Sequence, residues 1–343
     1  MQQPSIHHLR IAAALLCLPL AAAGAAAAAP FDAPQTGLAE SVQSHIDLAY
    51  LILKGDVSVR NLPGTLYLID EKTFEPPVPA ARKLESQPAA RAFDQFYYLG
   101  TSVVSAWALN TSDGIILFDT LNNAEEAAQY IEGGLKRVGL DPARIRDIVI
   151  THGHADHFGG AKYLQQKYHA RVLMSGIDWD NVQREAAAGT LRAAPPDRDV
   201  SIDDGQQLTL GRTTISFHLT PGHTPGTVST LIPVTDHGKP HVISFIGGTG
   251  LVGNKDLLQA GQVLRGSLQK FARLSLAAGA DALVTCHPFL DDSWDKAKRV
   301  NEGKARGASP WIAGTDAVLR YYAATIEAVY AIEANERLKA APR

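Results

Sequence analysis

The chain has 343 residues, of which 45% are hydrophobic and 20% are charged, so its length and composition exclude a wholly disordered protein and suit one large α/β domain or two modest ones. Its net charge is −3 and it has no basic block, which argues against a nucleic-acid partner. The chain has two cysteines and twelve histidines, so imidazole and carboxylate groups, rather than thiolates, would have to hold a transition metal.

Residues 1–29 have the pattern of a secretory signal peptide. One charge, Arg10, precedes an apolar run from Ile11 to Ala22, and Ala and Gly residues follow it. The run is too short and too rich in Ala for a typical membrane helix. We therefore expect a periplasmic or secreted protein with no membrane span after signal removal; a buried helix or an uncleaved anchor are the alternatives. Loss of Cys17 would leave Cys286 without a disulfide partner.

Residues 30–90 are expected to form an N-terminal extension that precedes the main domain at 91–340. Within it, residues 39–54 place Val42, Ile46, Tyr50 and Leu53 on one face of a helix. Residues 55–90 contain five prolines and predict an irregular strap.

From residue 91 onward, short apolar strands and helices alternate in two successive halves. The expected strands lie at 96–100, 103–110, 114–118, 147–150, 171–174, 207–210, 213–219, 228–234, 241–245 and 282–285. The expected helices lie at 124–138, 159–168, 257–277 and from Thr315 onward, and residues 185–206 indicate a polar connector. Strands followed by helices, twice, predict two packed sheets with helices outside.

The strongest chemical signal is the segment THGHADHFGG at residues 151–160. It contains His152, His154, Asp156 and His157 and follows an apolar strand, so it lies on a loop that can point several side chains into one cavity. Three imidazoles and a carboxylate are ligands suited to zinc, and four ligands this close suit two ions better than one. A solvated loop or a proton relay is the alternative.

Two further histidines lie at the ends of other expected strands. His223 is in TPGHTPG, where Pro and Gly residues fix a turn that aims one side chain, and His287 is in TCHP. Strand-end histidines far apart in sequence are what a metal cluster at a sheet edge needs. No role is assigned to Cys286, expected to be a small buried residue, or to His218.

HxHxDH at 152–157, PGHTPG at 221–226 and His287 together resemble the metallo-β-lactamase superfamily, over about residues 93–300. The resemblance implies an αββα sandwich with two zinc ions per chain at one edge of the sheets. The implied ligands are His152, His154 and His223 for the first zinc, and Asp156, His157 and His287 for the second. Asp119 matches the superfamily's aspartate at the end of an early strand, and is expected to orient the histidine loop.

One departure makes the chain look like the subclass B3 β-lactamases. Gly248 stands where many hydrolases of the superfamily, such as glyoxalase II and typical acyl-homoserine-lactone lactonases, carry a bridging aspartate. The B3 enzymes lack that carboxylate and use His as a second-site ligand. Serines that help them hold the substrate carboxylate are replaced here by Gly248, Thr249 and Gly250, and Thr249 is the expected substitute.

The function implied is that of an exported di-zinc hydrolase acting on a small molecule. Zinc lowers the pKa of bound water from about 15.7 towards 7, so a hydroxide would open a β-lactam ring without a protein nucleophile. Asp156 is expected to bind metal and to help orient that hydroxide. The alternatives are hydrolysis of another ester, lactone, amide or phosphoester, thiol oxidation at a single iron, and metal binding without turnover. Oligomeric state is not predicted.

Overall fold

The computed structural model describes residues 38–53, 88–251 and 254–340. The predicted signal peptide at 1–29 and nearly all of the strap predicted at 55–90 lie outside these ranges. None of the described helices combines the length and the apolar character needed to cross a membrane.

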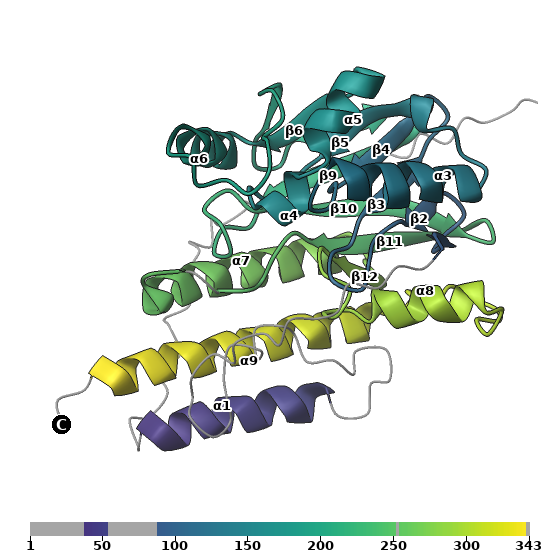
Figure 1. Ribbon diagram of the computed structural model, residues 1–343. Coiled ribbons are helices and arrows are strands. Elements are labelled where there is room, and N and C mark those ends of the chain that lie inside the picture. The colour runs from purple at the N-terminus through teal and green to yellow at the C-terminus, as the bar shows by residue number, and fades with distance from the viewer. Residues whose placement is uncertain (1–37, 54–87, 252–253, 341–343) are drawn as a thin grey trace, which may run out of the picture. The chain divides into compact units, whose positions relative to one another are not determined.

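Two β-sheets form the centre of the described domain (Figure 1). The first has seven strands in chain order: β1 (Ala90–Arg91), β2 (Phe96–Tyr98), β3 (Trp107–Asn110), β4 (Ile115–Phe118), β5 (Ile145–Val149), β6 (Arg171–Ser175) and β7 (Val200–Ile202). Strands β1 to β4 are antiparallel, whereas β4 to β7 run parallel. The central strand β4, antiparallel to β3 and parallel to β5, is buried along its whole length, as expected for a strand covered on both faces.

The second sheet has five strands. In spatial order they are β12 (Ala282–Thr285), β11 (Lys239–Ile246), β10 (Val228–Asp236), β9 (Thr213–Leu219) and β8 (Gln207–Leu210). The strands β8 to β11 form antiparallel pairs, and β12 pairs with β11 in parallel.

Helices cover the outer faces of both sheets, which gives the predicted αββα sandwich. On the first sheet lie α2 (Ala124–Glu126), η3 (Ala127–Glu132), α3 (Gly133–Arg137), α4 (Ala155–Phe158), α5 (Ala161–Tyr168) and α6 (Gly176–Ala187), with the short η4 (Pro142–Arg144) leading into β5. On the second lie α7 (Leu257–Ala277) and α9 (Thr315–Ala340), and α8 (Ser293–Asn301) precedes α9. Figure 1 shows α7 and α9 below the strands and α5 and α3 above them.

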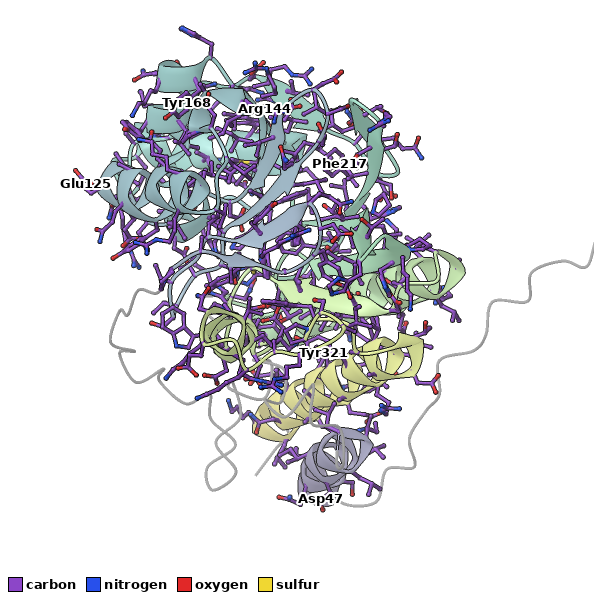
Figure 2. All side chains as sticks on the ribbon, turned by 90° about the vertical axis from the view of Figure 1, so that its right-hand side faces the viewer. Asp47, Glu125, Arg144, Tyr168, Phe217 and Tyr321 are labelled. Atoms are coloured by element: carbon purple, nitrogen blue, oxygen red, sulfur yellow. The ribbon has the colours of Figure 1, made fainter. Side chains whose placement is uncertain are left out.

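The two sheets face each other across an aromatic core. The rings of Phe118 on β4 and Phe245 on β11 bridge the sheets with centroids 5.5 Å apart. Phe96 stacks on Trp107 at 5.0 Å, and Phe217 on β9 is fully buried in the same cluster. Figure 2 shows side chains filling the space between the layers, with Phe217 labelled there and Tyr321 on α9. Burial of these rings contributes to the hydrophobic free energy that stabilises the fold.

The helix predicted at residues 39–54 is confirmed as α1 (Leu38–Leu53), which packs on α9. Val42, Ile46 and Leu53 are buried in the cluster that α9 shares with the second sheet. His45 adds a polar contact, with its Nδ1 2.7 Å from Oε2 of Glu327.

The connector predicted at 185–206 is wrong in part, because the structure has a helix and a strand there. The helix α6 continues to Ala187, and the edge strand β7 follows at Val200–Ile202. Neither element is evident from the sequence pattern, since α6 buries only two large apolar side chains, Trp179 and Val182, and β7 is three residues long. Trp179 joins them by donating from Nε1 to the carbonyl of Val200 at 2.9 Å.

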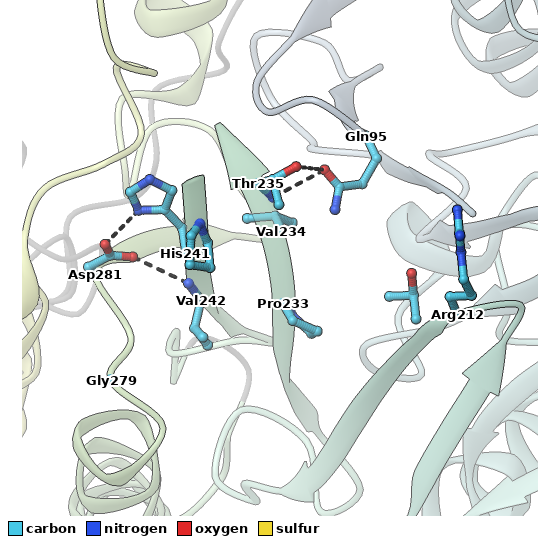
Figure 3. A pocket seen from close by; sticks show the side chains of 11 residues that line it. Gln95, Arg212, Pro233, Val234, Thr235, His241, Val242, Gly279 and Asp281 are labelled. Atoms are coloured by element: carbon cyan, nitrogen blue, oxygen red, sulfur yellow. Dashed lines mark hydrogen bonds and ion pairs between the residues drawn. The ribbon is translucent and has the colours of Figure 1, made fainter. Parts of the chain in front are cut away.

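The strand directions bring the loops that carry the predicted metal ligands to one edge of the two sheets. The carboxyl ends of the parallel pair β4 and β5 meet there, as do those of β11 and β12. The backbone N–H of Val228 donates to the carbonyl of Thr151 at 2.8 Å and joins the two sheets at this edge. A cavity of about 370 Å³ lies at the other end of β10 and β11, beside the His241–Asp281 pair (Figure 3).

Because Phe217 is fully buried between the sheets, Phe217→Ala should lower the free energy of unfolding by about 3–5 kcal/mol. Leu276→Ala is the control, since Leu276 is 52% exposed on α7 and should change the free energy by about 0.5 kcal/mol or less. Urea denaturation followed by circular dichroism measures both. Equal effects of the two substitutions would contradict the packing described.

Candidate metal centre

The structure brings the six sequence-predicted ligands together in two groups of three. In each group the ligand atoms lie within 4.8 Å of one another: His152, His154 and His223 form the first group, and Asp156, His157 and His287 form the second. The first group joins the loop after β5 to the turn between β9 and β10. The second joins Asp156 and His157, on the short helix α4 that follows the same loop, to His287, the second residue after β12.

The ligand atoms in both groups are closely spaced. Nε2 of His152 lies 3.0 Å from Nε2 of His223. Nε2 of His157 lies 3.3 Å from Nε2 of His287 and 3.3 Å from Oδ2 of Asp156. Tetrahedral zinc with ligands at about 2.0–2.1 Å requires ligand atoms about 3.3 Å apart, so these spacings fit zinc.

The hydrogen bonds made by the Nδ1 atoms explain why the close approach of the Nε2 atoms needs a cation between them. Nδ1 of His152 faces the carbonyl of Gly247 at 2.9 Å, and Nδ1 of His287 faces the carbonyl of Val103 at 2.8 Å. Nδ1 of His223 faces the carbonyl of Gly250 in the same way. A carbonyl only accepts, so each neutral ring donates from Nδ1 and carries its lone pair on Nε2. In the His152–His223 pair, two lone pairs therefore point at each other with no proton between them.

Burial keeps these imidazoles neutral. It lowers the pKa of His154, and it lowers that of His152 well below the ordinary value. Burial and the neighbouring histidines lower the pKa of His223 to about 3, and burial lowers that of His287 to about 4. Neutral imidazole is the form that binds metal, so the buried setting prepares these side chains as ligands.

His157 differs because two carboxylates flank its ring. Burial acts to lower its pKa, but the Asp156 and Asp119 carboxylates outweigh it and raise the pKa to about 10. Burial also acts against ionisation of Asp156, yet His157 and His287 hold its pKa below the ordinary range. The Asp156–His157 pair is therefore the part of the cluster that most strongly attracts positive charge.

Asp119 sits beneath the histidine loop and is completely buried. Its Oδ2 accepts from Nδ1 of His157 at 2.8 Å and from the hydroxyl of Thr151 at 2.9 Å, while Oδ1 accepts from the backbone N–H of Thr151 at 2.8 Å. Its φ of +58° is a left-handed conformation that costs free energy in a residue other than glycine. These contacts support the proposed role of orienting the loop.

Gly248 is in direct contact with a proposed metal ligand. A Cβ atom added there would lie 2.6 Å from Cδ2 of His223, so the ring occupies the space of any side chain at this position. Thr249 is 1% exposed, and its hydroxyl has no hydrogen-bond partner within the described part of the chain. The predicted substrate contact of Thr249 remains a proposal.

Cys286 is a buried neighbour of both ligand groups. Its Sγ is within 4.8 Å of ligand atoms of His152 and His157, but the side chain is completely buried. Burial, together with the nearby Asp119 and Asp156, raises the pKa of the thiol well above its ordinary value. Cys286 is thus a small buried residue, as expected from the sequence.

Asp178, a buried residue on α6 that joins two ligand loops, was not among the site residues predicted from the sequence. Its Oδ2 accepts from the backbone N–H of Gly153 at 2.8 Å and from the hydroxyl of Thr224 at 2.7 Å. Its Oδ1 accepts from the backbone N–H of Gly226 at 3.0 Å. One carboxylate thus fixes the His152–His154 loop against the turn that carries His223. Its only sequence signal would have been an acidic residue in the first turn of an unexpected helix.

Comparisons with known proteins agree with this geometry. Residues 99–236 match the family model of the metallo-beta-lactamase superfamily. A curated relative, the "probable polyketide biosynthesis zinc-dependent hydrolase BaeB" of Bacillus velezensis, is 30% identical over 132 residues, covering 37% of this chain and 53% of the relative. The chain thus spans about half the length of that relative.

Two solved structures share the fold. The FEZ-1 metallo-β-lactamase of Legionella gormanii superposes with a TM-score of 0.65 at 21% identity, covering 75% of this chain and 98% of that one. BJP-1, a subclass B3 metallo-β-lactamase of Bradyrhizobium japonicum, gives a TM-score of 0.57 at 23% identity, covering 75% and 94%. Residues 99–236 therefore match the metallo-β-lactamase superfamily, and the described domain has the fold of these two enzymes, one of which is a subclass B3 metallo-β-lactamase.

Asp178→Asn should weaken zinc binding by about 10–100-fold. Both oxygens of Asp178 accept hydrogen bonds, whereas an asparagine has one oxygen, so its NH₂ group would face at least one of these donors. Chelator competition on the zinc-loaded protein measures the change. Asp180→Asn is the control, since Asp180 is exposed on the same helix and pairs with Arg198. Equal zinc affinity in the two variants would remove Asp178 from any role in positioning the ligands.

Proposed function

We propose that this protein is an exported di-zinc hydrolase that opens the β-lactam ring of a small-molecule substrate. The observation that carries the proposal is the pair of ligand groups, His152/His154/His223 and Asp156/His157/His287, at spacings that fit zinc. The fold shared with FEZ-1 and BJP-1 supports the choice of a β-lactam. Export to the periplasm or outside the cell rests on the pattern of residues 1–29, which the structure does not describe.

In this proposal the protein groups hold, orient and protect the reacting centre. Two zinc ions, when bound, would polarise the substrate carbonyl and lower the pKa of a water molecule. The carbonyls of Gly247, Gly250 and Val103 fix the ring orientations of three of the histidines. The side chain of Asp156 is 36% exposed while His157 is completely buried, so Asp156 is the second-group residue placed to orient the attacking water.

Gly248 supports the B3-type form of the proposal. A side chain at 248 would meet the ring of His223 at its Cβ atom, so a carboxylate could be placed there only if the ring or the backbone shifted. The same machinery acting on another ester, lactone, amide or phosphoester is the second candidate, because the zinc-dependent relative is named only as a hydrolase in polyketide biosynthesis.

Zinc removal should abolish turnover of the chromogenic β-lactam nitrocefin, and zinc addition should restore it. Metal analysis of the purified protein should give two zinc ions per chain. One iron per chain would exclude the hydrolase proposal in favour of oxidation chemistry. If the protein holds two zinc ions but does not hydrolyse nitrocefin, the metal-centre proposal stands and the β-lactam substrate is rejected in favour of another one.

The two ligand groups should lose metal separately. His223→Ala removes a ligand of the first group and His287→Ala one of the second, so each variant should retain about one zinc ion, and turnover should fall by about 100-fold or more. His218→Ala is the control because His218 lies on β9 and its ring packs near Phe271. Two zinc ions retained in either ligand variant would contradict the assignment.

A further inference from the structure

His287 lies on the turn that connects β12, which ends at Thr285, with α8, which begins at Ser293. Its Nε2 has to stay close to Nε2 of His157, now 3.3 Å away, if the second ligand group is to hold an ion. The carbonyl of Val103 orients the ring, but the backbone of the turn carries it. The hydrogen bonds that hold this turn therefore determine where the ligand lies.

The turn closes on the carboxylate of Asp291. Oδ2 of Asp291 accepts from the backbone N–H of Thr285 at 2.8 Å, and Oδ1 accepts from the backbone N–H of Ser293 at 2.9 Å. Thr285 is the last residue of β12 and Ser293 the first of α8. One side chain thus joins the strand before His287 to the helix after it.

A second set of hydrogen bonds ties His287 itself into the turn. Its carbonyl accepts from the hydroxyl of Thr285 at 2.6 Å and from the backbone N–H of Leu290 at 3.1 Å. Thr285 is 1% exposed and donates twice, from its N–H to Asp291 and from its hydroxyl to His287. A shift of Thr285 away from Asp291 would therefore move the backbone of the ligand.

Asp291 acts through these backbone contacts rather than through its charge. The lowered pKa of His287 is caused chiefly by burial and by His157. Burial raises the pKa of Asp291 itself to about 6, against the opposing effect of Lys296. A neutral side chain would avoid the cost of placing a charge here, but only a carboxylate offers two acceptor oxygens to two buried backbone donors.

We propose that Asp291 is a positioning residue for the second ligand group, which holds the turn between β12 and α8 so that His287 faces Asp156 and His157. The inference rests on the two-zinc centre proposed above and not on the identity of the substrate. Asp178 makes contacts of the same kind in the first group, where it accepts from backbone N–H groups of two ligand loops. Each group would thus have its own buried carboxylate, and loss of Asp291 should weaken one site selectively.

Asp291→Asn tests this role because asparagine keeps the shape of the side chain but has one acceptor oxygen, so one buried N–H would face an NH₂ group. Chelator competition gives the stepwise zinc affinities of the purified protein. One affinity should fall by about 10–100-fold, and it should be the one that His287→Ala abolishes. The other should stay within about twofold. Asp295→Asn is the matched control, since Asp295 is exposed in the first turn of α8, and both of its affinities should equal those of the wild type.

The spectrum of bound cobalt separates a positioning role from a general loss of structure. With one equivalent of cobalt(II), the visible absorption of Asp291→Asn should match that of His287→Ala, because the ion occupies the first ligand group in both. If Asp291→Asn does not fold, Thr285→Val carries the test. Valine keeps the shape of threonine and removes the hydroxyl that donates to the His287 carbonyl, so affinity for the same ion should fall by about 2–10-fold.

Two results would overturn the inference: wild-type affinity for both ions in these variants, or equal weakening of both ions, which would indicate a general loss of structure. The proposed function fails in other ways. A wild-type protein that binds two zinc ions but does not hydrolyse nitrocefin rejects the β-lactam substrate and leaves the role of Asp291 to be decided by the affinities above. A wild-type protein that binds only one ion rejects the two-zinc centre, and this role of Asp291 with it.

Discussion

The approach of Nε2 of His152 to Nε2 of His223 at 3.0 Å is the contact on which the rest of the site depends. Two unprotonated ring nitrogens repel at this distance, and burial prevents either ring from taking up a proton to relieve the repulsion. The fold keeps them together by fixing the opposite side of each ring. A metal ion between the two nitrogens would replace this repulsion by coordination, so the two rings are placed as the proposed ligand roles require.

The ring orientations depend largely on main-chain atoms. The carbonyls of Gly247 and Gly250, both in the segment after β11, accept hydrogen bonds from Nδ1 of His152 and His223. The carbonyl of Val103 accepts from Nδ1 of His287, and the carboxylate of Asp119 accepts from Nδ1 of His157. Because the carbonyls belong to segments anchored by the two sheets, the geometry of the metal centre is coupled to the packing of the whole sandwich. A substitution far away that shifts one sheet would thus reach the metal ligands.

Much of the fold and of the site could be predicted from the sequence, for definite physical reasons. The strands Gln207–Leu210 and Thr213–Leu219 and the helix Leu257–Ala277 were predicted with the bounds that the structure shows, since their apolar periodicity and flanking turn residues are strong. The histidines were found because imidazole is rare and its spacing is distinctive. Asp178 was missed because a buried aspartate that binds backbone N–H groups looks, in sequence, like any acidic residue in the first turn of a helix. The backbone carbonyls that orient the histidine rings could not be predicted, because every residue carries a carbonyl and the sequence does not mark which ones face the site.

The contact between Gly248 and His223 has a consequence for how such sites diversify. With the backbone in this position, the Cβ atom of an aspartate at 248 would lie 2.6 Å from Cδ2 of His223, so the ring or the backbone after β11 must shift to admit it. The residue type at 248 and the placement of the His223 ring are therefore coupled, and a chain that changes one must also adjust the other.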